Sequence, residues 1–291
     1  MGCNRCSNGN SEKEYELLEF IKSNYNGEIV GRTREFKKYE LDIYLPKLKI
    51  AFEYNGMYWH STESKEKNYH YDKSKFFEDR GIRLIMIWED EWLMNNQKIK
   101  SYLRDLLLKK KIYYARKLLM KEVNRSQQIT FLNKNHLQGY FPSSVCLGLY
   151  DGEQLIQLLS LRKVKGSTYE IGRICTLSGN IVVGGSEKLF SNIKNLVVWS
   201  KIVSYNNRDK FAGQVYEKLG MKKEKDSESF FYSKNLIRHN RRRFQKAKLI
   251  KDGFDKNKTG NQIMKERGYL IIYTSGNSKF TITKWLSFVL V

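Results

Sequence analysis

The sequence predicts an α/β (α+β) protein with two folded domains and a basic C-terminal segment. At 291 residues the chain is longer than a single hydrophobic core usually supports. Hydrophobic residues make up 41% of it and aromatic residues 13%, which is enough for packed cores. Two successive stretches each alternate predicted helices with short strands. We therefore expect folded domains over residues 11–112 and 113–235, a basic segment over 236–291 and a short N-terminal segment over 1–10.

The first domain begins with a predicted helix over residues 11–24, where Ser11 and Glu14 form an S-x-x-E capping box. Three β-rich runs follow, then a second helix that stops at Gly81, then an apolar run typical of a strand buried on both faces. These strands are expected over 27–31, 39–45, 48–54 and 82–88, and the helices over 67–81 and 89–111. This order predicts a small domain with a mixed sheet.

The second domain opens with a predicted hairpin, two apolar runs joined by Asp151-Gly152. A strand over 169–177 and a glycine turn that opens a helix over 182–195 follow. The remaining elements are expected to be a strand over 201–206 and a helix over 211–220 that ends at Gly220. From Ser233 the composition changes to a run of eight Lys and Arg with no acid, ending at Lys251.

The formal net charge of +22 is concentrated in the second half of the chain. Residues 1–120 carry 23 Lys and Arg against 18 Asp and Glu, whereas residues 121–291 carry 30 against 13. An excess of one sign on this scale costs self-repulsion and is typical of proteins that bind nucleic acid. We therefore expect double-stranded DNA as the partner, and no protein partner is evident. General solubility charge is the alternative.

Several classes of protein are excluded by the sequence. No stretch approaches about 18 uncharged apolar residues, so no membrane span is expected. The first fifteen residues have no apolar run of the kind that a signal peptide needs. Four cysteines without a secretion signal do not indicate a disulfide framework. These features favour the cytoplasm of a bacterial or phage-infected cell.

A block of polar residues over 39–61 carries the strongest signal of chemistry. Asp42 lies on one predicted strand and Glu53 on the next, so that two neighbouring strands can present two carboxylates at one edge of the sheet. Such a pair is suited to hold Mg²⁺ against a phosphate. His60 follows shortly after and could transfer protons. His70 and Lys73 share a face of the next helix and can reach the same edge.

This block resembles the Vsr-like branch of the PD-(D/E)xK superfamily and, within it, the EDxHD homing endonucleases of phages. The resemblance rests on Asp42, the strand over 49–54, Gly56 and the run from Tyr58 to His60. It implies a restriction-endonuclease-like mixed-sheet core over roughly residues 10–95. It also implies a catalytic glutamate on the first helix, where Glu14 matches, although Glu14 is also the acid of the capping box.

The block departs from the (D/E)-x-K motif at one position, because Asn55 stands where the lysine would lie. Either Lys73 on the following helix supplies the cation, or the site needs none. The candidate catalytic residues are Glu14, Asp42, Glu53, His60, His70 and Lys73, with Asp42 and Glu53 as the metal ligands. Trp59 is interpreted as a core residue rather than a wedge inserted into DNA.

Cys3 and Cys6 form half of a zinc ribbon. A closed structural zinc site needs four ligands, and Cys146 and Cys175 each lie alone in apolar β-rich runs typical of core positions. The pair is therefore interpreted as a partial remnant of a zinc ribbon, and bound Zn²⁺ is the minor alternative.

The second domain resembles the GNAT acyltransferase fold, including the Mom-like branch that modifies DNA. The resemblance rests on the hairpin, on the glycine turn Val183–Ser186 and on the spacing of Ala212, Tyr216 and Gly220. In that fold the glycine turn opens a helix whose amides bind the pyrophosphate of acyl-CoA. The full (Q/R)-x-x-G-x-(G/A) signature is absent. Acyl-CoA is therefore not expected as a cofactor, and the same amides could hold a DNA phosphate.

The sequence thus predicts a Mg²⁺-dependent double-stranded DNA endonuclease that hydrolyses phosphodiester bonds. Its basic C-terminal residues would contact the DNA backbone. The residues expected to do so are Arg238, Arg241, Arg242, Arg243, Lys246 and Lys248. The alternatives are a Mom-like base-modifying acyltransferase with a vestigial nuclease domain, and a DNA-binding protein without catalysis.

Overall fold

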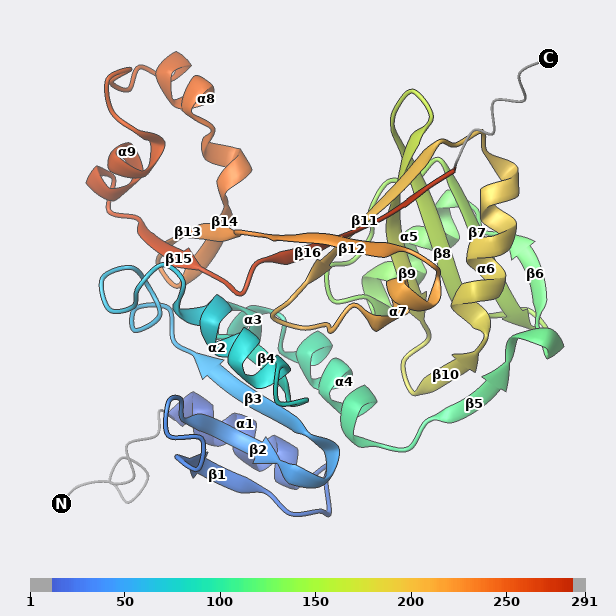
Figure 1. Ribbon diagram of the computed structural model, residues 1–291, viewed down its shortest axis with the longest axis horizontal. Coiled ribbons are helices and arrows are strands. Elements are labelled where there is room, and N and C mark those ends of the chain that lie inside the picture. The colour runs from blue at the N-terminus through green and yellow to red at the C-terminus, as the bar shows by residue number, and fades with distance from the viewer. Residues whose placement is uncertain (1–11, 285–291) are drawn as a thin grey trace. The chain divides into compact units, whose positions relative to one another are not determined.

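The computed structural model describes residues 12–284 and divides into two compact units, each discontinuous in sequence (Figure 1). Unit 1 contains residues 12–96, 207–212 and 226–277. Unit 2 contains residues 97–206, 213–225 and 278–284. The division at residues 112 and 235 that the sequence suggested stays a prediction, since compactness alone does not show what folds independently.

Unit 1 contains a four-stranded mixed sheet in the order β1-β2-β3-β4. Its strands are β1 (Val30–Thr33), β2 (Leu41–Leu45), β3 (Ile50–Asn55) and β4 (Arg83–Trp88). Strand β2 pairs antiparallel with both β1 and β3, whereas β3 and β4 run parallel with Glu53 opposite Met86. As the apolar run of β4 predicts, five of its six residues are buried.

Helices pack against this sheet through their apolar stripes. Helix α1 (Glu12–Lys22) buries Leu17 and Ile21 and contacts β3, and helix α2 (Tyr69–Glu78) inserts Phe77 into a cluster with Leu84 of β4. The single helix predicted over 89–111 is in fact two helices, α3 (Glu89–Met94) and α4 (Asn96–Leu107). Asn95 separates them because its backbone, at φ −122°, leaves the helical region.

The C-terminal part of unit 1, residues 230–273, is called here the basic lobe. Its three-stranded antiparallel sheet has the order β14-β13-β15, and two short helices follow β14. The elements are β13 (Phe230–Lys234), β14 (Ile237–Asn240), α8 (Lys246–Lys251), α9 (Gly260–Glu266) and β15 (Leu270–Tyr273). The lobe has a small core of its own, made of Tyr232, Leu249, Ile263, Met264 and Ile271.

Unit 2 is built on a seven-stranded sheet in the order β12-β16-β11-β9-β8-β7-β6. The strands are β6 (Leu119–Glu122), β7 (Val145–Asp151), β8 (Gln154–Lys165), β9 (Thr168–Thr176), β11 (Lys201–Asn207), β12 (Lys222–Ser227) and β16 (Asn277–Thr283). The predicted hairpin is confirmed as β7 and β8, which pair antiparallel around Asp151-Gly152. Strands β9 and β11 are parallel neighbours.

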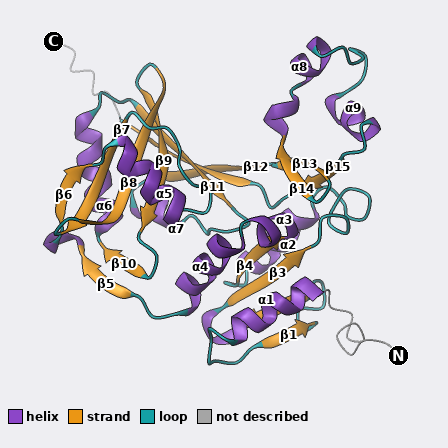
Figure 2. Ribbon diagram, turned by 180° about the vertical axis from the view of Figure 1, so that it is seen from behind, coloured by secondary structure: helices purple, strands orange, loops and turns teal. Residues whose placement is uncertain are grey.

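Helices cover both faces of this sheet (Figure 2). Helix α6 (Gly185–Ile193) packs Leu189 and Phe190 on one face, and helix α5 (Arg125–Asn135) packs Phe131 and Leu132 on the other. A separate sheet is formed by two parallel strands, β5 (Lys111–Tyr114) and β10 (Asn180–Val183). The last helix of the unit, α7 (Gln214–Lys218), is shorter than predicted and begins after Gly213, which has a φ of +83°.

Among the helices of residues 12–284, none has the length and apolar composition needed to cross a membrane.

Candidate functional site

Unit 1 gathers the carboxylates that the sequence singled out. Asp42 of β2 and Glu53 of β3 belong to neighbouring antiparallel strands, and Asp42 accepts a hydrogen bond from the backbone N–H of Tyr54 (2.8 Å). Lys73 of α2 forms a buried ion pair with Glu53. Burial raises the pKa of Asp42 well above its usual range, and the nearby charges of Glu53 and Glu14 raise it further. Asp42, Glu53, Lys73 and Glu14 are called here the carboxylate cluster.

Glu14 of α1 reaches the same cluster by its charge, since it also raises the pKa of Glu53. Its carboxylate pairs with Arg32 of β1, with Nε and Oε1 3.4 Å apart. The capping box expected for Glu14 involves Ser11, which lies outside the described residues. The side chain of Glu14 is only 12% exposed, so its position in the helix is not that of a solvated cap.

The two predicted histidines meet each other. Nδ1 of His60 and Nε2 of His70 are 2.9 Å apart, so one ring donates and the other accepts. Burial lowers the pKa of His60 to about 3, and the cations of Lys65 and Lys73 contribute. The pKa of His70 is also well below its usual value, first because of burial and then because of His60. Both rings are therefore neutral at pH 7.

The predicted metal ligands are not arranged as an open cation site. Lys73 already neutralises Glu53, and burial favours the protonated form of Asp42. Within residues 12–284, no three His, Cys, Asp or Glu side chains are grouped in a way that could hold a metal ion. Cys3 and Cys6 lie outside the described residues, and Cys146 and Cys175 are buried core thiols of unit 2.

The predicted DNA-contacting residues divide into two groups. Arg238 of β14 is buried, with its side chain 8% exposed, and it pairs with Asp90 (2.9 Å) and Glu91 (2.9 Å) of α3. It is therefore a structural cation of unit 1 and not available to a phosphate. The other five are all exposed: Arg241, Arg242, Arg243, Lys246 and Lys248.

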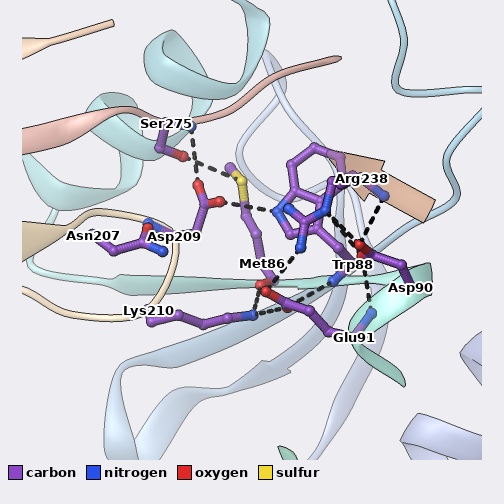
Figure 3. A network of polar contacts seen from close by, with 9 residues as sticks. All are labelled: Met86, Trp88, Asp90, Glu91, Asn207, Asp209, Lys210, Arg238 and Ser275. Carbon is purple, nitrogen blue, oxygen red and sulfur yellow. Dashed lines mark hydrogen bonds and ion pairs between the residues drawn. The ribbon is translucent and has the colours of Figure 1, made fainter. Parts of the chain in front are cut away.

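Arg238 belongs to a buried polar network in unit 1 that sequence reasoning missed (Figure 3). The segment Asn207–Ala212, at the end of β11, lies against β4 and α3. Asp209 accepts hydrogen bonds from Trp88 Nε1 (2.9 Å) and from the backbone N–H of Ser275 (2.9 Å). Lys210 pairs with Glu91 at 2.6 Å. No local pattern could reveal these contacts, because their partners lie far apart in the sequence.

In unit 2 the parallel strands β9 and β11 pair over only part of their length. Lys201–Val203 are in register with Thr168–Glu170. Gly172 then forms a bulge, since Ser160 and Leu161 of β8 lie opposite Arg173 and Ile171. Beyond it, β9 runs on to Thr176 and β11 to Asn207 without a registered pair between them in the described residues.

Tyr216 of α7 lies next to the diverging strands, and its ring packs on Phe280 of β16 (5.1 Å between centroids). Burial raises its pKa above the usual value, while the Ser204 hydroxyl and the charge of Arg173 partly offset this. Ser204 belongs to β11 and is 1% exposed. The sequence spacing placed Tyr216 on the last helix of the domain, but did not mark it as a site residue.

At the start of α6, the side chain of Gln157 approaches the helix backbone closely. Gly184 has a φ of +72°, and a Cβ on Gly185 would meet Oε1 of Gln157 at 1.9 Å. Gln157 is 4% exposed and donates to Thr176 (3.0 Å) and Ser186 (3.3 Å). Its Oε1 is buried without a hydrogen-bond partner in the structure. The first amides of any α-helix also lack partners inside the helix.

No family model matches the chain, and no curated protein matches it. Solved structures do match, and those named here are acetyltransferases. A Bacillus subtilis acetyltransferase in complex with CoA is 14% identical (TM-score 0.36), with 58% of this chain and 100% of that chain covered. A GNAT family acetyltransferase from Elizabethkingia anophelis with acetyl-CoA bound is 15% identical (TM-score 0.36), with 58% and 99% covered. The ribosomal-protein-S18-alanine N-acetyltransferase of Escherichia coli is 8% identical (TM-score 0.36), with 60% and 98% covered.

These similarities extend over about 58% of the chain, and the sequence analysis expected a GNAT-like fold for the second domain. The predicted restriction-endonuclease-like core is not shown. The expectation of a Mg²⁺-dependent endonuclease is corrected, because the matching structures named above are acetyltransferases. The cofactor expectation, which favoured Mg²⁺ over acyl-CoA, is corrected by the same structures, several of which were solved with CoA or acetyl-CoA.

Proposed function

We propose that unit 2 is an acyltransferase that uses acyl-CoA as its acyl donor. The observation that carries this proposal is the separation of the parallel strands β9 and β11 beyond the bulge at Gly172. Backbone N–H and C=O groups on separated strand edges need partners. An extended ligand that carries amide groups, as the pantetheine arm of CoA does, can pair with such edges in the way that an added strand does.

The N-terminus of α6 suits the phosphate end of the same donor. Gly185 lets the side chain of Gln157 pack directly against the turn, and the unpaired amides of the first turn attract anions. The chain departs from the usual glycine signature here. The backbone amides of the first turn of α6 would still be the groups that hold the phosphates.

When bound, acyl-CoA supplies an acyl group activated as a thioester. The ordinary pKa of a tyrosine is near 10 and burial raises that of Tyr216 further, so its phenolic oxygen carries a proton at neutral pH. Tyr216 can therefore act as a general acid that releases this proton to a departing thiolate. Phe280 holds the phenol in place by packing against its ring.

The phosphate-binding role of α6 is tested by placing a negative charge in its first turn. Ser186→Glu should weaken CoA binding by tenfold or more, measured by titration calorimetry, because the carboxylate repels the phosphates and fills the turn. Ser191→Glu makes the same change near the other end of the same helix, at an exposed position, and should leave the affinity nearly unchanged.

Wild-type protein that binds neither CoA nor acetyl-CoA at millimolar concentration would overturn the proposal. Equal losses in the two variants would show that CoA binds away from the N-terminus of α6.

A further inference from the structure

We infer that the basic lobe is a binding surface for the phosphate backbone of double-stranded DNA. This surface, called here the lobe cations, consists of Arg241, Arg242, Arg243, Lys246, Lys248, Lys251 and Lys256. All seven side chains are exposed. Residues 241–256 contain only two acids, Asp252 and Asp255, so the surface carries a strong net positive charge.

The lobe cations take no part in the ion pairs of the lobe. Its apolar core and its ion pairs use other residues, with Lys258 paired to Glu266 (2.7 Å) and Lys265 paired to Glu63 (3.2 Å). Among the described residues, no salt bridge involves any of the seven. Like charges brought this close repel one another, and that cost is offset only when a polyanion binds.

The lobe cations are carried by segments that are fixed by packing and capping contacts. Arg241 stacks on Phe230 at 4.9 Å, and Asn240 caps the turn Arg241–Phe244 by accepting from the backbone N–H of Arg242 (3.0 Å). Leu249 anchors α8 in the core, which leaves Lys246, Lys248 and Lys251 outside. Figure 1 shows α8 and α9 in the orange part of the chain, above the strands β13, β14 and β15. The charges are thus presented by ordered elements rather than by a loose tail.

Double-stranded DNA fits this surface better than an anionic membrane does. Duplex DNA carries one charge per about 1.7 Å of its axis and rewards a cluster of cations by releasing counterions. Membrane-surface helices instead need a broad apolar face to insert. Of the large apolar side chains near the lobe cations, only Leu236 (49%) and Ile250 (39%) are substantially exposed. This inference does not depend on the proposed acyl transfer.

The test compares two triple variants of the full chain, each of which loses three positive charges. Arg242→Gln, Arg243→Gln and Lys246→Gln remove lobe cations. Lys163→Gln, Lys165→Gln and Lys222→Gln remove exposed lysines of unit 2. Binding to a fluorescent duplex of about 25 base pairs, long enough to span two helical turns, is followed by anisotropy at several salt concentrations. Because all six side chains are exposed, both variants should keep the wild-type melting temperature.

The lobe triple should lose tenfold or more in affinity near 0.1 M salt. Its slope of log K against log [salt] should flatten by up to about 0.9 for each phosphate that the variant no longer neutralises. The control triple should change both quantities much less. Equal losses in the two variants would show that net charge alone, not this surface, holds DNA. Tighter, lobe-dependent binding to vesicles of anionic phospholipid than to DNA would assign the surface to a membrane.

Discussion

Tyr216 is the side chain on which the proposed chemistry depends most directly. Replacing it with Phe keeps the ring that packs on Phe280 and removes only the proton donor. If Tyr216 protonates the leaving thiolate, Tyr216→Phe should lower kcat by roughly 10²-fold, within the usual range for general acid catalysis, and leave the KM for acyl-CoA within about threefold. Release of free thiol over time measures both constants.

The matched control for this variant is Tyr205→Phe. Tyr205 lies on β11 beside Ser204, but its side chain is 50% exposed. Its loss should leave kcat unchanged. A kcat for Tyr216→Phe within threefold of wild type would remove Tyr216 from the mechanism without touching the proposal that CoA binds at α6.

At the same scale, sequence reasoning was more successful in unit 1 than in unit 2. The sequence predicted that Asp42, Glu53 and Lys73 lie at one edge of a sheet, because strand alternation and helix periodicity are local rules. It could not show that Lys73 would neutralise Glu53, nor that Asp42 would favour its protonated form. Both depend on burial, which is set by distant parts of the chain.

At the level of elements, long apolar runs were predicted well and polar ones were missed. Strands β4, β7 and β8 were found because nearly every residue in their centres is buried. Strand β12, with the sequence KKEKDS, has no buried residue and forms only through its neighbour in the sheet. Helix α5 was overlooked because its polar surface hides the contribution of Phe131 and Leu132.

The segment Asn207–Ala212 shows how a short element can be fixed by polar contacts alone. Both carboxylate oxygens of Asp209 accept hydrogen bonds, from Trp88 Nε1 and from the N–H of Ser275. Asp209→Asn places an NH₂ group against one of these donors and leaves that donor without an acceptor. The free energy of unfolding should fall by about 1–3 kcal/mol, measured by urea denaturation.

Asp252→Asn is the control for this prediction, since it removes the same charge from an exposed position of the same unit. It should change the free energy of unfolding by less than about 0.5 kcal/mol. If Asp209→Asn is equally harmless, the network in Figure 3 contributes little to stability and the segment is held by its backbone contacts instead.

For the whole molecule, the two compact units share one chain that passes between them several times. Residues 226–277 of unit 1 are inserted in the chain between two strands of the unit 2 sheet. Strand β12 ends near residue 226, and β16 begins at residue 277. A sequence divided at single boundaries cannot represent this arrangement. The basic run after Ser233 was therefore interpreted as a separate C-terminal segment, although its residues form a lobe with a core inside unit 1.

We expect the stability of the protein against acid to depend on histidines in both units. These are His60 and His70 in unit 1 and His136 in unit 2. Burial lowers the pKa of His136 to about 3, from an ordinary value near 6.5. Between these two pH values the unfolded chain binds a proton at His136 and the folded chain does not. The free energy of unfolding therefore falls as the pH drops through this window, by up to about 1.4 kcal/mol per pH unit for each such group.

His136→Asn keeps an acceptor for the N–H of Gln138 and removes the titrating ring. Urea denaturation at several pH values from about 7 down to about 4, inside this window, should show a smaller loss for this variant than for wild type. His239→Asn, the same substitution in the basic lobe, leaves the ring of His136 in place and should keep the loss due to that ring. If His136→Asn loses as much stability as wild type across this range, His136 is protonated in the folded protein, and the acid sensitivity arises from unit 1 or from the carboxylates.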